Sequence, residues 1–334
     1  MSGGIMQLVA IGEQDTHLSK DPTFSFFKSA FRRHTNFSQV VESQTMQMTP
    51  VSNGISTVRF EKKGDLLSYI YLSNDTAYTD WTTLISKVEL LIGGQVIDEQ
   101  DSTFTEFIAI DTMAQNVSKS SNGPHGGNGV NSKFYPLRFW FCENWHSALP
   151  LIALQYHNVE IRITWGSSPV TDLRCYANYI YLDTDERKKI VNQGATDYLI
   201  TQVQKNIASN DKKQELTFNH PVKYVSSKTG NLTNTSKVTF QINGADIDDP
   251  KSGSPHFTEI TSYYHTSFVT SPDTFLYPFC LNCAQFQPSG TLNFSRLDSA
   301  RIVNETDDVD TDIYAVNYNI LRIQNGMAGI MYAN

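Results

Sequence analysis

Cys280 and Cys283 are separated by two residues, and two thiolates at this spacing can supply half of a zinc site or form a redox dithiol. A structural zinc site needs a second pair, but Cys142 and Cys175 lie far apart and belong to no ligand motif. A redox dithiol opens a helix, whereas Cys280 lies in the strand-like run YPFCL at 277–281. We therefore disfavour both functions. We expect Cys280 to be a small apolar side chain in a buried strand, in a protein that keeps its thiols reduced.

Three aspartates have the beginning of a calcium-binding pattern. Asp308, Asp310 and Asp312 match the first three spacings of an EF-hand loop. However, Ile313 stands at the glycine position of that loop, and Asn319 stands at its final glutamate position. An EF-hand is therefore excluded, and only a loose cation site remains open.

The eight histidines show no metal-ligand spacing. His146 and His157 fall in apolar stretches, and we expect them to form structural hydrogen bonds. His125 lies in the glycine-rich segment 123–129, where we expect a solvated side chain on an exposed loop. The chain lacks the phosphate-loop, nucleophile-elbow and zinc-protease motifs. We therefore expect no catalytic, cofactor-binding or metal-binding residues, no cofactor and no enzyme activity.

The composition describes a globular, mostly β protein. The chain has 334 residues, of which 18% are charged and 40% hydrophobic, which excludes a disordered chain or a coiled coil. It contains 31 Thr and 24 Asn but only 16 Ala and 12 Glu, so strand and turn formers outnumber helix formers. The net charge of −8 argues against direct nucleic-acid binding. No apolar run approaches the roughly 20 residues of a membrane span.

We expect no secretory signal, because residues 1–11 lack a positively charged start and an adequate apolar stretch. Glycosylation sequons therefore stay unused, since their modification requires a secretory lumen. They include Asn36, Asn74, Asn116, Asn231 and Asn293.

The two halves of the chain repeat each other. Residues 86–99 read SKVELLIGGQVIDE and residues 236–249 read SKVTFQINGADIDD, with seven of fourteen positions identical. Three further pairs of blocks follow in the same order: FTEF at 104–107 and FTEI at 257–260, FYP at 134–136 and LYP at 276–278, and CYANYIYL at 175–182 and IYAVNYNI at 313–320. A repeat of about 140–150 residues indicates tandem domains.

The repeated unit is predicted to be a β-sandwich. Gly93-Gly94 and Asn243-Gly244 are two-residue hairpin turns that tolerate positive φ. Runs at 159–164, 237–242 and 314–320 alternate apolar and polar residues, and the run LSYIYL at 67–72 is expected to be buried on both faces. Short strands, glycine-rich turns and long loops favour Greek-key sandwiches of about eight strands in each half.

We divide the chain into an N-terminal arm (1–22), a first sandwich (23–183), a linker (184–200) and a second sandwich (201–334). The linker is expected to carry a short helix capped by Asp183 or Thr184. We expect the two sandwiches to dock along an apolar flank rather than to swing on the linker.

Blocks along the whole chain match a known family. They are GGIMQLVAIGEQD at 3–15, FFKSAFRRHTNF at 26–37, ALPLIALQYH at 148–157, YLDTDER at 181–187, FNHPV at 218–222, QPSGTLNFSR at 287–296 and YAVNYNILRI at 314–323. These blocks resemble the major capsid proteins of large eukaryotic DNA viruses, the iridovirus, phycodnavirus and giant-virus group.

The resemblance implies an all-β double jelly roll, that is, two tandem eight-stranded antiparallel β-sandwiches. It also implies homotrimeric, pseudo-hexagonal capsomers that tile an icosahedral viral shell and contact neighbouring capsomers and minor capsid proteins. The protein would then be located in the virion capsid and assembled in the host cytoplasm. Because members of this family are often longer, a minor or paralogous capsid protein stays open as an alternative. A carbohydrate-binding jelly roll also stays open, whereas a cupin-like enzyme would need clustered histidine ligands.

A basic segment at 20–34 interrupts this acidic chain, and we weigh two interpretations of it. Its charged residues are Lys20, Lys28, Arg32, Arg33 and His34. In the first interpretation, the segment contacts minor capsid proteins or the anionic headgroups of an internal membrane. In the second, it is an ordinary strand edge on which four phenylalanines pack, namely Phe24, Phe26, Phe27 and Phe31.

Overall fold

The computed structural model describes residues 3–23, 26, 31–78, 80–116, 119, 132–267, 271 and 273–333. It separates into two units, Met1–Asn36 and Phe37–Asn334. The first unit contains the short helices α1 (Gly3–Val9), η1 (Glu13–Asp15) and α2 (Thr16–Ser19).

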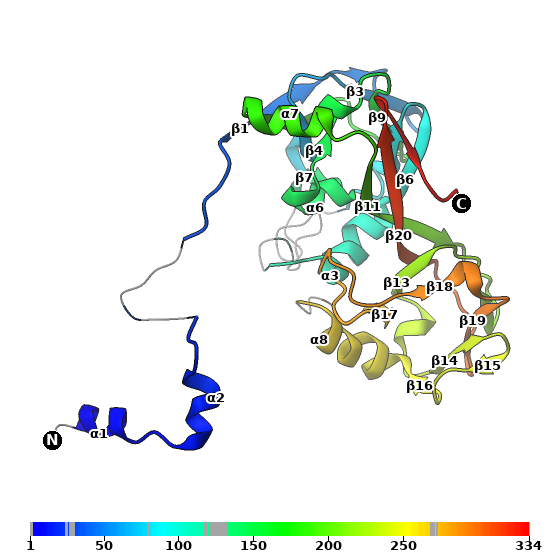
Figure 1. Ribbon diagram of the computed structural model, residues 1–334. Helices are drawn as coiled ribbons and strands as arrows, with labels where there is room; N and C mark the ends of the chain where they lie inside the picture. The colour runs from blue at the N-terminus through cyan, green and yellow to red at the C-terminus, as the bar shows by residue number, and fades with distance from the viewer. Residues whose placement is uncertain are drawn as a thin grey trace. The chain divides into compact units, whose positions relative to one another are not determined.

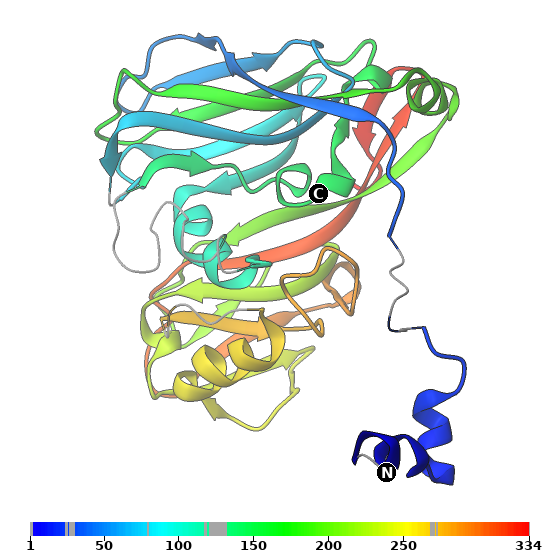
Figure 2. The same cartoon turned by 90° about the vertical axis from the view of Figure 1, so that its left-hand side faces the viewer.

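The first half of the second unit is a sandwich of two antiparallel sheets (Figures 1 and 2). One sheet has the order β1-β10-β4-β7, with β8 beside β4. Its strands are β1 (Phe37–Gln44), β4 (Leu66–Tyr78), β7 (Ser132–Pro136), β8 (Leu149–Pro150) and β10 (Arg174–Leu182). The other sheet has the order β2-β3-β9-β5-β6. Its strands are β2 (Met46–Gln47), β3 (Ile55–Phe60), β5 (Ile85–Ile92), β6 (Gln95–Asp101) and β9 (Val159–Trp165).

Short helices lie between the strands of this half along the chain. They are η2 (Phe104–Ile108), α3 (Ala109–Thr112), α6 (Trp140–Glu143), η3 (Trp145–Ser147) and η4 (Leu151–Ala153). Helix α7 (Thr184–Asn192) then leads to the second half, and the Asp183 carboxylate caps it by accepting the Thr184 N–H. Arg187 of α7 forms an ion pair with the buried Asp65 at 2.9 Å, which ties this helix to the first half.

The second half is another two-sheet sandwich. One sheet has the order β11-β20-β13-β17, with β18 beside β13 and β21 beside β20. Its strands are β11 (Thr196–Asn206), β13 (Pro221–Lys228), β17 (Thr274–Pro278), β18 (Leu292–Asn293), β20 (Ile313–Gln324) and β21 (Met327–Ile330). The other sheet has the order β12-β19-β14-β15, with β16 beside β14. Its strands are β12 (Lys213–Glu215), β14 (Lys237–Ile242), β15 (Ala245–Asp246), β16 (Lys251–Ser252) and β19 (Ala300–Asn304). The helices are η5 (Asn231–Thr233), η6 (Gly253–Ile260), α8 (Thr261–His265) and η7 (Phe294–Arg296).

The two sandwiches have the same topology. In each, the first, eighth, third and sixth main strands form one sheet, and the second, seventh, fourth and fifth form the other. The repeated sequence blocks occupy equivalent elements: the hairpins β5–β6 and β14–β15, the helices η2 and η6, the strands β7 and β17, and the strands β10 and β20. Both hairpin turns have positive φ at their two central residues, as predicted. The predicted double jelly roll and the internal duplication are therefore confirmed.

Two predicted burial patterns are wrong. The run at 67–72 is buried on one face, but on the other face Tyr69 is exposed and Tyr71 is half-buried. Conversely, β20 does not alternate, because Asn317 and Asn319 are buried along with the apolar residues. β20 runs beside β11 between the two jelly rolls, so both of its faces are covered (Figure 2).

Candidate functional site

The two jelly rolls meet along a buried seam. Phe104 and Ile108 of η2 pack in one apolar cluster with Tyr224 of β13 and Tyr314 of β20. β20 then continues into the first jelly roll, where Leu321 belongs to the core. The expected docking along an apolar flank is confirmed, and one strand contributes to both cores.

Hydrogen bonds between β6 and β11 reinforce the seam. The Asp98 carboxylate accepts the backbone N–H of Val203 at 2.9 Å, and the Gln202 side chain donates to the Ile97 carbonyl. Burial raises the pKa of Asp98 to about 7, although Val203, Gln100 and a neighbouring backbone N–H donate to the carboxylate. Asp98 therefore holds the two jelly rolls together through a carboxyl group that is costly to ionise.

Two ion pairs also cross the seam. Lys205 of β11 contacts Asp101 of β6 at 2.9 Å, and the same carboxylate accepts the Tyr314 hydroxyl at 2.6 Å. Asp111 of α3 lies 3.6 Å from Lys228 of β13. The Asp111–Lys228 pair is largely buried, so separating the two halves would leave these charges poorly compensated, whereas the more exposed Lys205–Asp101 pair contributes less.

Glu106, also on η2, is a buried carboxyl group with few hydrogen bonds to stabilise its ionised form. One oxygen accepts the Trp81 backbone N–H at 2.5 Å, while Oε2 has no hydrogen-bond partner among the described residues. Burial raises the pKa of Glu106 to about 8. The equivalent residue of the second jelly roll, Glu259, is exposed. The glutamate of the repeated block therefore faces protein in one copy and solvent in the other.

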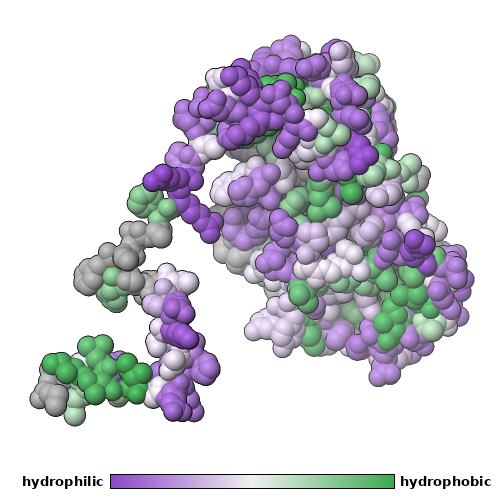
Figure 3. All heavy atoms as spheres, in the orientation of Figure 1, coloured by the Kyte–Doolittle hydropathy of each residue, from purple (hydrophilic) through white to green (hydrophobic). Residues whose placement is uncertain are grey.

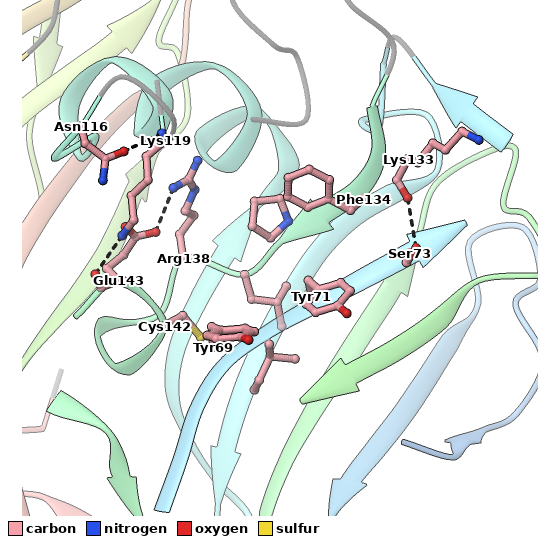
Figure 4. Close-up of a pocket in the computed structure, with 13 residues that line it drawn as sticks. Tyr69, Tyr71, Ser73, Asn116, Lys119, Lys133, Phe134, Arg138, Cys142 and Glu143 are labelled. Carbon is pink, nitrogen blue, oxygen red and sulfur yellow. Dashed lines mark hydrogen bonds and ion pairs between the residues drawn. The ribbon is translucent and has the colours of Figure 1, made fainter. Parts of the chain in front are cut away.

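A pocket of about 730 Å³ opens on the outer face of the sheet β1-β10-β4-β7 (Figure 4). Tyr69 and Tyr71 of β4 and Phe134 of β7 line it. The Tyr71 ring also stacks on Tyr176 of β10, with centroids 5.2 Å apart. This aromatic surface was missed from the sequence, because tyrosines alternating with Ile70 and Leu72 were counted as equally apolar.

Charged side chains form one wall of the pocket. Glu143 pairs with Arg138 at 2.9 Å and with Lys119 at 3.0 Å (Figure 4). Burial alone would raise the pKa of Glu143, but the two cations outweigh it and hold the pKa below its ordinary value. Each carboxylate oxygen of Glu143 thus contacts one cation, so the network fixes Arg138 and Lys119 against helix α6.

The aspartates at 308–312 serve the local structure. Asp310 accepts the Asn231 backbone N–H at 2.9 Å, and Asp312 contacts Lys205 at 2.7 Å. Within the described part of the chain, no three His, Cys, Asp or Glu side chains gather as metal ligands.

The predictions for the histidines and cysteines are confirmed only in part. His157 is structural as predicted, since its Nδ1 lies 3.0 Å from the Ala328 carbonyl oxygen. His146 is exposed on η3, with its ring edge-on to that of Trp145, and its expected structural hydrogen bond stays a prediction. His125 lies outside the described residues. Cys280 is buried as predicted, but it follows the end of β17 and lies in a bend, with its sulfur 3.5 Å from that of Cys283.

The N-terminal unit exposes apolar side chains, and Figure 3 shows the hydrophobic character of α1. Phe26 and Phe31 belong to this unit, and both interpretations of the basic segment 20–34 stay predictions. Phe24, Phe27 and Lys28 lie outside the described residues. Among the residues that are described, no helix is long and apolar enough to cross a membrane.

Known proteins match both halves of the chain. A family model for the major capsid protein N-terminus matches residues 25–183, and one for the large eukaryotic DNA virus major capsid protein matches residues 225–329. The major capsid protein of Pyramimonas orientalis virus is 35% identical, and that of Paramecium bursaria Chlorella virus 1 is 30% identical, each over 100% of both chains. A quasi-atomic model of the PBCV-1 virus capsid superposes with a TM-score of 0.78 at 27% identity, over 93% of this chain and 100% of that one. The chain thus belongs to the major capsid proteins of large eukaryotic DNA viruses.

Proposed function

We propose that three copies of this chain form a homotrimeric capsomer of pseudo-hexagonal outline, and that such capsomers tile an icosahedral shell. The observation that carries this proposal is the duplicated strand order within one compact unit. A trimer of a duplicated domain presents six similar bodies, so it can occupy a hexagonal lattice without six separate subunits. The role is structural, without catalysis or direct nucleic-acid binding.

The contacts along the seam support this proposal because they join the two jelly rolls to each other. A tile must keep its two halves in fixed orientation, and the shared strand β20 and the contacts of Asp98 and Asp101 supply that rigidity. We also propose that the jelly rolls comprise 23–183 and 201–334, joined by 184–200 and preceded by the arm 1–22.

We propose that the basic segment 20–34 provides contacts beyond the trimer. Its charged residues, including Arg32 and Arg33, would meet minor capsid proteins or anionic headgroups of an internal membrane. Assembly would take place in the host cytoplasm, where the four cysteines remain free thiols.

Size-exclusion chromatography with light scattering tests the trimer. The proposal predicts a stable particle of three times 37.6 kDa. A monomer that binds glycans would instead support a carbohydrate-binding jelly roll, and a monomer without any such activity would also contradict the proposal.

A further inference from the structure

Cys280 and Cys283 lie next to each other at the seam between the two jelly rolls. Their sulfur atoms are 3.5 Å apart, and both residues are buried. They belong to the apolar cluster in which Phe104 and Ile108 of the first jelly roll pack against the second. Because a disulfide bond is about 2.05 Å long, the two sulfurs need to approach each other by only about 1.5 Å to be joined.

The backbone of the two cysteines is held by a single histidine. The strand expected at Cys280 argues against a redox pair, but β17 ends at Pro278 and both cysteines lie in the irregular segment that follows. The Cys280 carbonyl oxygen lies 2.9 Å from Nδ1 of His265, and the Cys283 N–H donates to the His265 carbonyl oxygen at 2.7 Å. These contacts keep the two cysteines adjacent while their side chains rotate.

A buried lysine adds positive charge beside the pair. Lys223 of β13 is 4% exposed, and its Nζ donates to the backbone carbonyl oxygen of Gln285 at 2.6 Å. Burial lowers the pKa of Lys223, and the negative charge of a thiolate at Cys280 or Cys283 opposes this shift. The lysine therefore stabilises a thiolate, which is the form of cysteine that reacts with oxidants.

The two thiols are not equivalent. The S–H of Cys283 donates to the sulfur of Cys280, and this hydrogen bond holds the pKa of Cys280 below its ordinary value. Burial opposes that shift, and the charge of Lys223 supports it. Burial raises the pKa of Cys283 instead. Cys280 is therefore the sulfur that attacks an oxidant, and Cys283 is the sulfur that completes the disulfide.

We propose that Cys280 and Cys283 are a peroxide-sensitive dithiol, which hydrogen peroxide converts into a disulfide within the second jelly roll. The Cys280 thiolate attacks one peroxide oxygen, the O–O bond breaks, and hydroxide leaves as Cys280 becomes a sulfenic acid. The Cys283 sulfur then attacks the Cys280 sulfur, the S–O bond breaks, and a second hydroxide leaves. The two thiol protons convert both hydroxides into water. Two thiols are thus oxidised and one peroxide is reduced, giving one disulfide and two waters.

The oxidation would accompany the passage of a capsid protein out of the cell. Thiols stay reduced in the cytosol, whereas disulfides persist at virion surfaces. The bond would lie in the loop between β17 and β18, from which Phe286 packs on the core of the first jelly roll. We expect it to fasten this loop at the seam after the chain has folded. This inference does not depend on the proposed trimer.

Peptide mass spectrometry of the full, unmutated chain tests the proposal. The reduced protein is treated with hydrogen peroxide, and the remaining thiols are then alkylated. The peptide that carries Cys280 and Cys283 should lose two hydrogen atoms and escape alkylation at least about 10-fold sooner than Cys142 and Cys175 react. These two thiols are internal controls, because burial raises the pKa of both. A pair that reacts no faster than the controls, or that forms disulfides only between chains, would overturn the proposal.

Single variants test the roles of the two sulfurs. Cys283→Ser should stop at a sulfenic acid on Cys280, which a dimedone probe labels. Cys280→Ser should lose the fast reaction with peroxide. Circular dichroism checks that both variants are folded. Labelling of Cys283 at the wild-type rate in Cys280→Ser would contradict the assignment of Cys280 as the attacking sulfur.

A lysine variant tests the contribution of charge. Lys223→Met keeps the length of the side chain but removes its charge, so oxidation should slow by at least about 5-fold. The matched control is Lys237→Met, at an exposed lysine of the same jelly roll, and it should react at the wild-type rate. Equal rates for both variants would contradict the role of Lys223.

Thermal melts test whether the bond fastens the loop. The oxidised protein should melt roughly 2–4 °C above the reduced protein, a small shift because the disulfide closes a short loop. Dithiothreitol should reverse the shift, and peroxide-treated Cys283→Ser should not show it. An oxidised protein that melts no higher than the reduced one would contradict the stabilising effect of the disulfide.

Discussion

The Asp98 carboxylate accepts a hydrogen bond from the backbone N–H of Val203 across the boundary between the two jelly rolls, at 2.9 Å. Its equivalent in the repeat, Asp248, instead accepts the Tyr277 hydroxyl of its own jelly roll at 2.8 Å. At this repeated position, the aspartate of the first copy therefore links the two jelly rolls. The seam is accordingly built from specific polar contacts as well as from apolar burial.

Replacing Asp98 by alanine should destabilise the protein more at pH 5 than at pH 8. The pKa of Asp98 is raised to about 7 in the folded protein, so its stabilising contribution is full below its ordinary pKa of about 4 and declines as the pH rises through 7. At pH 5 the loss should be on the order of 1–3 kcal/mol, because the Val203 N–H loses its acceptor. Urea unfolding at both pH values measures this, with Asp172→Ala as a surface control. An equal loss at both pH values would contradict the prediction.

Glu106→Gln should stabilise the protein at alkaline pH and change little at pH 5.5. The folded-state pKa of Glu106 is raised to about 8, so wild-type stability declines as the pH rises through 8, whereas glutamine cannot ionise. Melting temperatures at pH 5.5 and pH 9 measure the effect. Glu259→Gln, at the exposed counterpart position, serves as the matched control. A Glu106→Gln variant that is less stable than the wild type at pH 9 would contradict the raised pKa of Glu106.

Gly93→Ala should cost more stability than Gly94→Ala, although both residues have positive φ in the same turn. Each substitution carries backbone strain of about 1–2 kcal/mol. A Cβ atom at Gly93 would also meet the ring of His157, whereas a Cβ atom at Gly94 would enter open space. Denaturant unfolding of the two variants should therefore differ by at least about 1 kcal/mol. Equal losses would mean that the His157 ring moves away without cost.

Reversing the charge of Arg32 and Arg33 should block shell assembly and spare the trimer. Both arginines belong to the unit Met1–Asn36, whereas the strands of the two jelly rolls belong to the unit Phe37–Asn334, so this reversal should not affect the folding of the jelly rolls. Light scattering detects the trimer, and electron microscopy of assembly reactions detects the shells. Reversal of the exposed Lys188 and Lys213 provides a control of equal charge. Normal shells from the Arg32→Glu/Arg33→Glu variant would contradict the proposed role of the basic segment 20–34.

The fold was largely predictable from the sequence, because the duplication leaves matching hairpins and helices in both halves. The function of each surface was less predictable. The sequence places Glu106 and Glu259 in nearly identical blocks, yet one is buried and the other exposed. The difference depends on which jelly roll packs against which, and this long-range packing leaves no mark in the local pattern. Likewise, the exposure of Tyr69 depends on whether another part of the fold covers the outer face of its own sheet.

Electron microscopy of the purified capsomer tests the central proposal most directly. We expect particles with a hexagonal outline, in which six similar densities alternate around a threefold axis and each chain contributes two of them. Particles with only three densities, or isolated two-lobed monomers at all concentrations, would contradict the proposal that a duplicated chain builds a hexagonal tile.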